Sequence, residues 1–342
     1  MKGLKEHRSD NLHTVVYKKA SPDEILSAEL GPQYTEYRKK WGRVSECRLE
    51  QDYPLHLNFE IFYGCNLRCS MCILSKPIGE RGYKTEPEKR ISFDKYKEII
   101  DEGVKRGLCA VQLNGHNEPL LQDDLTEYIQ YARNSGIIDI YLITNATLLT
   151  PEKAEELLSS GLTQIKFSMD SVLKETYEKL RVGGNFEKTL ENINTFLQMK
   201  KKMKKILPVT RVSFVKTPEN KSEVNDFIGY WSDRVDYITV QDMVDPFVVD
   251  EAVSEGSLNN KKNLSKCSMP YQRMFIRNNG DVSPCCSTYG FQLPVGNVYE
   301  SSIYEIWNGK RLSTLRKRIN GPFEKQPIPC RKCRRSLEHI TS

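Results

Sequence analysis

Short apolar runs alternate with amphipathic stretches through the middle of the chain. The strand-like runs occupy residues 55–62, 109–114, 138–144, 163–169, 209–215 and 235–241. The helix-like stretches lie between them, near residues 92–106, 122–135, 151–160, 186–203 and 221–232. Strands separated by helices of this length are typical of βαβ units and a parallel sheet. The pattern therefore predicts an α/β fold.

Residues at the expected helix starts agree with this pattern. Ser92 precedes one amphipathic stretch, and Thr150 with Pro151 begins another. A hydroxyl side chain caps the first turn of a helix, and proline is tolerated at its first position. Ser21 and Pro22 predict a further short helix in the same way.

The two ends of the chain have different patterns from the middle. Residues 1–54 are polar and mixed, and we expect an N-terminal extension there without the strands of a peptide-binding module. Residues 254–266 are rich in Ser, Asn, Gly and Lys and are interpreted as a linker. Residues 275–282 predict a hairpin that turns at Asn279-Gly280. Residues 301–319 predict one helix with Ile303, Ile306, Trp307 and Leu315 on one face.

Charge and composition narrow the class of protein. The net charge of +6 does not require a nucleic-acid partner. Residues 1–10 lack the apolar segment of a signal peptide, and no run has the length of a membrane span. We therefore expect a cytoplasmic protein, in which ten cysteines are better explained as metal ligands than as disulfides.

Three cysteines follow the first strand-like run closely. Cys65, Cys69 and Cys72 have C-x3-C-x2-C spacing. Soft sulfur ligands on one loop suit an iron–sulfur cluster. Three ligands leave one iron of a four-iron cluster open for chemistry. Zinc is the structural alternative, although zinc sites usually combine C-x2-C pairs from two separate turns.

The segment from Cys65 to Cys72 resembles the cluster loop of radical S-adenosylmethionine (radical SAM) enzymes. The resemblance implies that the open iron binds S-adenosylmethionine. An electron then cleaves this molecule to methionine and a 5′-deoxyadenosyl radical, which removes a hydrogen atom from a substrate. Met71 matches the bulky residue that packs near the adenine. The implied fold is a partial (β/α)6 barrel, whose functional groups lie at the C-terminal ends of the strands.

Further segments resemble the family's cofactor contacts. In the segment 115–119, Glu118 matches the residue that binds the amino group, with Asn117 beside it, although the second glycine of the family pattern is absent. Ser168 and Asp170 resemble a Ser-x-Asp motif near the carboxylate or ribose. Arg181 resembles an arginine that pairs with the carboxylate, a role that suits a planar guanidinium. Asn145 is expected to hydrogen-bond cofactor or substrate.

Three residues are candidates on the substrate side. Gln241 and Asp242 end the sixth strand-like run, and Asp242 is a candidate general base. His116 is a candidate substrate or proton contact, with a purely structural histidine as the alternative. Polar residues end most strands of any barrel, so the sequence alone does not choose between these roles.

A second set of cysteines follows the linker. Cys267, Cys285, Cys330 and Cys333 resemble the SPASM/twitch extension of radical SAM enzymes, in its single-cluster form. The resemblance implies one auxiliary [4Fe–4S] cluster without an open iron. A zinc ribbon is the structural alternative. Cys286 is a spare thiol beside this set.

These observations predict an N-terminal extension at 1–54, a radical SAM core at 55–253, and a linker with an auxiliary domain at 254–342. The arrangement looks most like that of twitch-bearing aminocyclitol dehydrogenases, which implies oxidation at a carbinol carbon. The expected substrate is a sugar, nucleotide sugar or cyclitol, and the expected electron donor is a flavodoxin or ferredoxin. A peptide maturase and a redox-neutral sugar dehydratase or epimerase are the alternatives. An electron carrier without enzymatic activity would leave Glu118, Ser168 and Arg181 unexplained.

Overall fold

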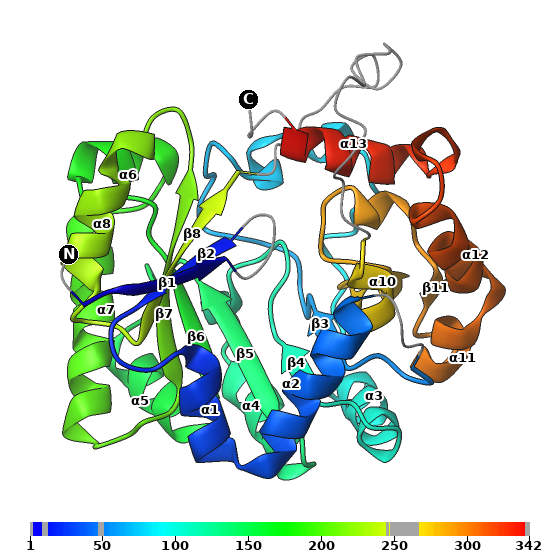
Figure 1. Ribbon diagram of the computed structural model, residues 1–342, viewed down its shortest axis with the longest axis horizontal. Helices are drawn as coiled ribbons and strands as arrows, with labels where there is room; N and C mark the ends of the chain where they lie inside the picture. The colour runs from blue at the N-terminus through cyan, green and yellow to red at the C-terminus, as the bar shows by residue number, and fades with distance from the viewer. Residues whose placement is uncertain (1–2, 9–12, 47–50, 244–245, 247–266, 339–342) are drawn as a thin grey trace. The chain divides into compact units, whose positions relative to one another are not determined.

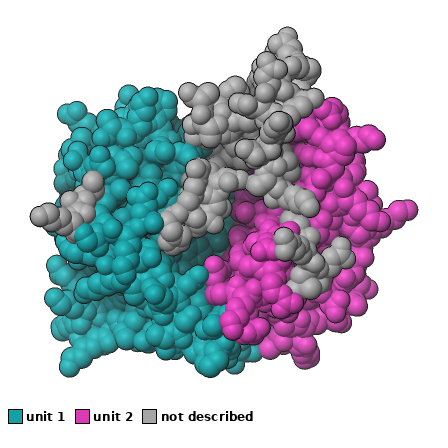
Figure 2. Space-filling view, viewed as in Figure 1, with its two compact units in different colours: residues 1–35, 64–75, 111–243 teal, residues 36–63, 76–110, 244–342 magenta. Residues whose placement is uncertain are grey.

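The computed structural model describes residues 3–8, 13–46, 51–243, 246 and 267–338. Its chain divides into two compact units, shown in different colours in Figure 2. Unit 1 contains residues 1–35, 64–75 and 111–243, and unit 2 contains residues 36–63, 76–110 and 244–342. Each unit is therefore built from segments that are far apart in the sequence.

Unit 1 is organised around a sheet with the strand order β1-β2-β8-β7-β6-β5-β4 (Figure 1). Strands β5 to β8 are parallel, whereas β2 pairs with β8 in the antiparallel direction. The strands are β1 (Lys5–Arg8), β2 (His13–Tyr17), β4 (Ala110–Gln112, which begins in unit 2), β5 (Asp139–Thr144), β6 (Gln164–Ser168), β7 (Val209–Lys216) and β8 (Tyr237–Asp242).

Helices cover the outer face of this sheet. Phe167 of β6 packs on Phe196 with 5.4 Å between the ring centroids, and Phe214 of β7 packs on Phe227 at 4.9 Å. Because strand side chains alternate, the neighbours of Phe167 and Phe214 lie on the opposite face, called the inner face below. The two helices that carry these partner rings are α7 (Phe186–Lys202) and α8 (Val224–Trp231). The unit also contains α1 (Pro22–Leu30), the start of α2 (Pro32–Ser45, most of which lies in unit 2), α4 (Leu125–Asn134), α5 (Pro151–Ser159) and α6 (Lys174–Leu180).

Unit 2 combines the first core strand with the C-terminal region. Strand β3 pairs with β9 in parallel, and β9, β10 and β11 pair in the antiparallel direction. Phe59 of β3 packs on Tyr96 of α3 at 4.9 Å. The elements are β3 (His56–Phe59), β9 (Arg273–Ile276), β10 (Asp281–Ser283), β11 (Gly296–Asn297), α3 (Phe93–Lys105), α10 (Met269–Gln272), α11 (Ile303–Asn308), α12 (Lys310–Ile319) and α13 (Ile328–Glu338).

Short 3-10 turns complete both units. They are η1 (Ile73–Ser75), η2 (Ile78–Glu80), η3 (Pro119–Leu121), η4 (Lys221–Glu223), η5 (Gly290–Gln292) and η6 (Phe323–Lys325).

The predicted α/β pattern is confirmed, and each of the six strand-like runs contains one of the strands β3 to β8 or most of it. The predicted caps are also confirmed. Ser92 accepts a hydrogen bond from the Lys95 amide at 3.2 Å, Thr150 accepts from the Lys153 amide at 3.3 Å, and Ser21 forms a capping box. The predicted hairpin is the pair β9–β10, with Gly280 in the left-handed region at φ 88°.

Two predictions from the sequence were wrong. The helix expected over 301–319 is two helices, because the backbone of Gly309 is extended (φ −72°, ψ 160°) and ends α11. The N-terminal extension does contain strands: β1 and β2 form a hairpin, and β2 pairs with the edge of β8. Residues 5–8 are all polar or charged, so the apolar pattern did not mark β1.

The remaining expectations about organisation stay predictions. The linker at 254–266 lies outside the described residues, so the division into 1–54, 55–253 and 254–342 is not tested. Within the described part of the chain, no helix combines the length and the apolar character that crossing a bilayer requires.

Candidate functional site

The loop with the first three cysteines is fixed to its own unit by backbone hydrogen bonds. The Arg68 amide donates to the Val182 carbonyl, and the Ser70 amide donates to the Leu180 carbonyl, both at 2.9 Å. The Glu118 amide donates to the Gly64 carbonyl, also at 2.9 Å. The loop is therefore held by the segment after α6 and by the turn after β4.

The three thiols of this loop converge. Burial raises the pKa of Cys72 to about 11, and the charges of Cys69 and Cys65 add to the shift. Burial also raises the pKa of Cys65 and of Cys69. Such thiols stay protonated until a metal replaces the proton. The loop thus offers three sulfur ligands in one shielded place.

Nitrogen donors reach two of the sulfur atoms. The Asn145 side-chain amide donates to Cys65 Sγ at 3.8 Å, and to Asn66 Oδ1 at 3.0 Å. Arg181 Nη1 donates to Cys69 Sγ at 3.8 Å. Donors placed beside sulfur stabilise thiolate charge, as iron–sulfur ligation requires.

Glu118 is buried at the centre of this arrangement. Its carboxylate accepts hydrogen bonds from the Leu120 amide (3.1 Å), the Thr144 hydroxyl (2.6 Å) and the Asn145 amide (2.7 Å). Burial raises the pKa of Glu118, while these bonds oppose the rise. A carboxylate has roughly four acceptor positions, so one stays available for a ligand.

Arg181 forms a buried ion pair with Asp170. The two side chains are 9% and 1% exposed, and Arg181 Nη2 lies 2.5 Å from Asp170 Oδ2. Burial lowers the pKa of Arg181, but the charges of Asp170 and Cys69 outweigh it and raise the pKa overall. The Val215 amide donates to the other oxygen of Asp170 at 2.8 Å. The Arg181 guanidinium therefore stays positively charged and is held in one orientation.

Unit 1 brings together most of the residues that the sequence singled out around S-adenosylmethionine. Asn117 accepts from the Gly115 amide at 2.7 Å and forms a bridge with Gly64. Ser168 lies on the inner face, level with Ser213 of β7. Met71 lies half-buried between Ser70 and Cys72.

The three candidates on the substrate side lie at the end of β8 and in the turn after β4. Asp242 Oδ1 lies 2.5 Å from Lys216 Nζ, so its charge is engaged at the end of β8. Gln241 precedes it on the inner face and is half-buried. His116 is half-buried in the turn after β4.

The sequence did not indicate how Thr144 and Asn66 support the site. Thr144 positions Glu118, and Asn66 donates to the Thr147 hydroxyl at 2.8 Å while accepting from Asn145. Both are polar residues beside residues that were chosen, Asn145 and Cys65. Their positions next to Asn145 and Cys65 in the sequence could have identified them.

The second cysteine set lies in unit 2. Burial raises the pKa of Cys285 well above its ordinary value, and the charges of Cys286, Cys267 and Cys333 add to the shift. Ser287 donates to Cys333 Sγ at 3.8 Å. Cys330 shares α13 with Cys333, three residues apart, and therefore one side of that helix.

The donor sets fit clusters better than single ions. Across the described residues, no group of three His, Cys, Asp or Glu side chains has the spacing that would hold a single metal ion. In a four-iron cluster each thiolate binds a different iron, so its ligands stand farther apart than those of zinc. The two sets would thus hold two clusters, with Cys65, Cys69 and Cys72 at one and Cys267, Cys285, Cys330 and Cys333 at the other.

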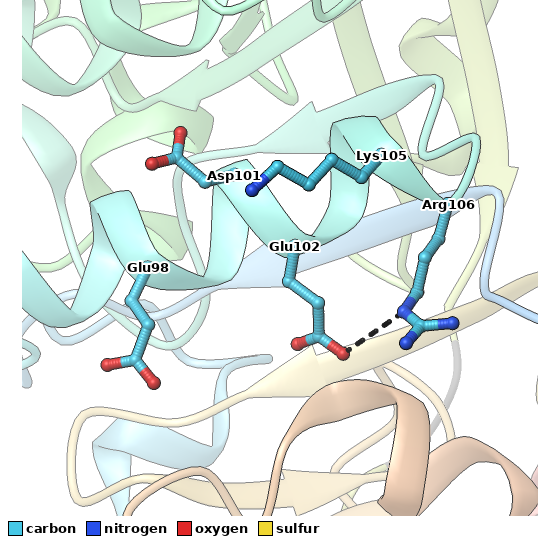
Figure 3. A pocket seen from close by; sticks show the side chains of 5 residues that line it. All are labelled: Glu98, Asp101, Glu102, Lys105 and Arg106. Carbon is cyan, nitrogen blue, oxygen red and sulfur yellow. Dashed lines mark ion pairs between the residues drawn. The ribbon is translucent and has the colours of Figure 1, made fainter.

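A pocket on α3 of unit 2 has a different character. Glu98, Asp101, Glu102, Lys105 and Arg106 line it (Figure 3). The Glu102 carboxylate accepts from the amides of Ile303 and Tyr304, at 3.2 and 3.0 Å, at the start of α11. It therefore caps a helix, and the pocket adds no group to the cysteine sites.

Comparisons with known proteins agree with this geometry. The family described as the radical SAM superfamily matches residues 59–229, and the iron–sulfur cluster-binding SPASM domain matches residues 267–334. A GTP 3′,8-cyclase from Alkaliphilus oremlandii is 32% identical over 171 residues, which are 50% of each chain. An AdoMet-dependent heme synthase from Methanosarcina barkeri is 35% identical over 143 residues, 41% of this chain and 38% of its own. The chain thus spans about half the length of the curated relatives it matches, or less.

Solved structures share the fold at low identity. BtrN in complex with AdoMet and 2-DOIA has a TM-score of 0.54 at 15% identity, covering 83% of this chain and 94% of its own. SuiB of Streptococcus suis bound to S-adenosylmethionine has a TM-score of 0.57 at 13% identity, covering 97% and 93%. The anSMEcpe enzyme with bound AdoMet has a TM-score of 0.59 at 18% identity, covering 83% and 91%.

The predicted partial (β/α)6 barrel with a C-terminal SPASM domain is confirmed by these findings. The two families also confirm [4Fe–4S] clusters and S-adenosylmethionine as cofactors. Because the family match covers 171 of the 342 residues and includes the three-cysteine loop and its partners, the chain belongs to the radical SAM superfamily.

Proposed function

We propose that the protein binds S-adenosylmethionine at the Cys65–Cys72 loop and starts radical chemistry on a polar small molecule. The observation that carries the proposal is the convergence of three thiols in the unit that also holds Glu118 and Arg181. A structural metal loop would not need a buried carboxylate and a buried guanidinium beside it. The proposal uses both.

The residues of the loop and its neighbours have separate roles. Cys65, Cys69 and Cys72 would hold a cluster that, when bound, supplies the electron for cleavage of S-adenosylmethionine to a 5′-deoxyadenosyl radical. Arg181 directs its charge to the carboxylate of the methionine moiety. Glu118 offers its remaining acceptor position to the ammonium group.

Asp170 is proposed as a positioning residue. Both of its carboxylate oxygens are engaged, by Arg181 and by the Val215 amide. It therefore holds the guanidinium in place, instead of reaching the ribose or the substrate as the sequence alone suggested. Asn145 and Asn117 shape the loop in the same supporting way.

The favoured reaction is the two-electron oxidation of a carbinol carbon. A hydrogen atom leaves the carbon, a proton leaves the hydroxyl, and one electron remains to be removed. The second cysteine set in unit 2 supports this choice, because a cluster held there would supply an electron acceptor. Gln241 is the better-placed polar group to hydrogen-bond the hydroxyl, since Asp242 is engaged by Lys216, and the proton passes to water because an amide is not a base.

Peptide modification is the second candidate. SuiB bound to its precursor peptide SuiA shares the fold, with a TM-score of 0.56 at 13% identity. The relatives named GTP 3′,8-cyclase point instead, by their name, to a nucleotide. The small-molecule proposal is favoured by two cations on the inner face, Lys166 and Arg211, which lie level with each other.

Reductive cleavage of S-adenosylmethionine tests the proposed function directly. Anaerobically reconstituted protein with a strong reductant is expected to release 5′-deoxyadenosine, measured by chromatography. Cys69→Ala should reduce the release to background. Cys109→Ala is the matched control, because its thiol belongs to neither cysteine set and donates to the Gly107 carbonyl at 3.3 Å. If fully loaded wild-type protein releases none, the proposal fails.

A further inference from the structure

Two cations lie side by side on the inner face of unit 1. Lys166 of β6 is level with Arg211 of β7, and Arg211 is level with Tyr237 of β8. Residues at one level of a parallel sheet point to the same side. The two positive side chains are therefore neighbours, each at the third residue of its strand.

The alternation along each strand shows which way they point. Ile165 and Phe167, on either side of Lys166, are fully buried, and Phe167 packs on α7. Lys166 and Arg211 are only partly buried. Both side chains consequently face away from the helices, toward the inner side of the sheet.

Aromatic rings, and not a carboxylate, surround Arg211. Its guanidinium carbon lies 5.3 Å from the ring centroid of Tyr141 and 5.6 Å from that of Tyr237. Among the described residues, Arg211 has no Asp or Glu among its electrostatic neighbours; it shares a hydrogen bond with Tyr237, and its buried Nε has no hydrogen-bond partner. A guanidinium taken out of water without an opposite charge is costly unless another group pairs with it.

Lys200 in the same unit differs from Arg211, because a carboxylate pairs with it. Lys200 is largely buried, and Asp236 lies 2.9 Å from its ammonium. The same Asp236 accepts from the amide and the hydroxyl of Thr210, next to Arg211. The carboxylate that immediately precedes β8 is thus committed to another cation, and Arg211 keeps its charge for something else.

Hydroxyl side chains lie between these cations and the carboxyl ends of the strands. Ser168, Ser213 and Thr239 lie at one level on β6, β7 and β8, two residues beyond Lys166 and Arg211. Asp170, which holds Arg181, follows Ser168 by two residues. Along the inner face, cations, hydroxyls and the proposed S-adenosylmethionine contacts therefore succeed one another.

We propose that Lys166 and Arg211 bind an oxyanion, a phosphate or carboxylate carried by the substrate, below the hydroxyls of Ser168, Ser213 and Thr239. This rests on the proposed function, because it names the substrate class of the same site. A planar guanidinium and an ammonium together match the several oxygens of such a group. The substrate is then an anionic polyol, such as a sugar phosphate or nucleotide sugar, and not a neutral cyclitol.

Anion titration tests the proposal without requiring turnover. Reconstituted holoprotein, saturated with S-adenosylmethionine so that Arg181 is occupied, is titrated calorimetrically with inorganic pyrophosphate and, separately, with malonate. Arg211→Gln and Lys166→Gln should each weaken binding of the preferred anion by about tenfold or more, since hydrogen bonds to charged groups contribute that much. Lys188→Gln is the control, because Lys188 is exposed on α7 and pairs with Glu191 at 3.2 Å; it should bind as wild type does.

The outcomes separate the possibilities. Loss of pyrophosphate binding supports a phosphate, and loss of malonate binding alone supports a carboxylate. Binding of neither anion, or binding that both glutamine variants retain, overturns the proposal. If Arg211→Gln does not fold by circular dichroism, Lys166→Gln decides. Failure of the proposed function is seen separately, as absence of 5′-deoxyadenosine.

Discussion

At the scale of single residues, Asp170 shows how a site residue can act without touching a ligand. Its backbone is in the left-handed region, at φ 63°, which aspartate tolerates better than most residues. The Asn220 side chain donates to the Asp170 carbonyl at 2.8 Å, and the carboxylate binds Arg181 and the Val215 amide. Three elements therefore fix one acidic group, and that group fixes the arginine.

Asp170→Asn is expected to destabilise the protein by about 3–5 kcal/mol, because it leaves the buried charge of Arg181 without its partner. Asp233→Asn is the matched control. Asp233 pairs with Lys18 on the surface, with side chains 66% and 42% exposed, and such pairs contribute about 0–1 kcal/mol. Urea unfolding measures both. Equal effects of the two variants would contradict the structural role given to Asp170, and a weaker affinity for S-adenosylmethionine in Asp170→Asn would support its positioning role.

At the scale of elements, the short turn η5 shapes the second cysteine set. A Cβ atom added to Gly290 would lie 2.3 Å from Cys285 Sγ and 3.3 Å from the Cys285 carbonyl oxygen. Real Cβ atoms do not approach so closely, so glycine is required for the turn to pass the thiol. The turn and the thiol are therefore coupled.

Gly290→Ala should displace Cys285 and remove iron from the second set, while the first set keeps its iron. Total iron is then expected to fall from about eight to about four atoms per chain, measured by a colorimetric assay of reconstituted protein. Gly229→Ala is the control, because a Cβ there meets nothing within 4 Å. A Gly290→Ala protein with its full iron content would show that Cys285 is not a ligand.

The regular elements were predictable from the sequence because their signals are local. Alternation and caps located β3 to β8 and most helices within a few residues. The break at Gly309 was not predictable in the same way, because Ile303, Ile306 and Leu315 keep a helical apolar spacing across it. Strand β1 was not predicted because an edge strand need not be apolar.

The sequence predicted individual residues of the site, but not which residues they would pair with. Motif resemblance pointed to Cys65, Glu118 and Arg181, but their partners come from distant segments. The pairing of Asp170 with the Val215 amide depends on the register of β6 against β7, which no local pattern contains. The neighbouring positions of Lys166 and Arg211 depend on the same register.

At the scale of the whole molecule, the two cysteine sets belong to different units. Cys65, Cys69 and Cys72 lie in unit 1, whereas Cys267, Cys285, Cys330 and Cys333 lie in unit 2. Each set has its own local framework: backbone bonds to residues 180–182 for the first, and the η5 turn with α13 for the second. Loss of one set should therefore leave the other able to bind iron.

Replacing Cys65, Cys69 and Cys72 together by alanine should leave about four of roughly eight iron atoms, and replacing Cys330 and Cys333 should leave the other four. Only the second variant should still release 5′-deoxyadenosine. Iron analysis and chromatography on the same samples check both statements. Complete iron loss in either variant would mean that the two sets do not load independently.

The division of the chain between the units also constrains how the protein can be made. Six segments alternate between the units, so the backbone passes from one to the other five times. Strand β3 leaves the ribosome early, but its parallel partner β9 is synthesised only after all of unit 1. Unit 2 cannot be completed until the last part of the chain appears, and its early strand must wait with an open edge. Neither unit can therefore be expressed as one continuous fragment, and a cut after residue 243 would keep the segments of unit 1 together but divide unit 2.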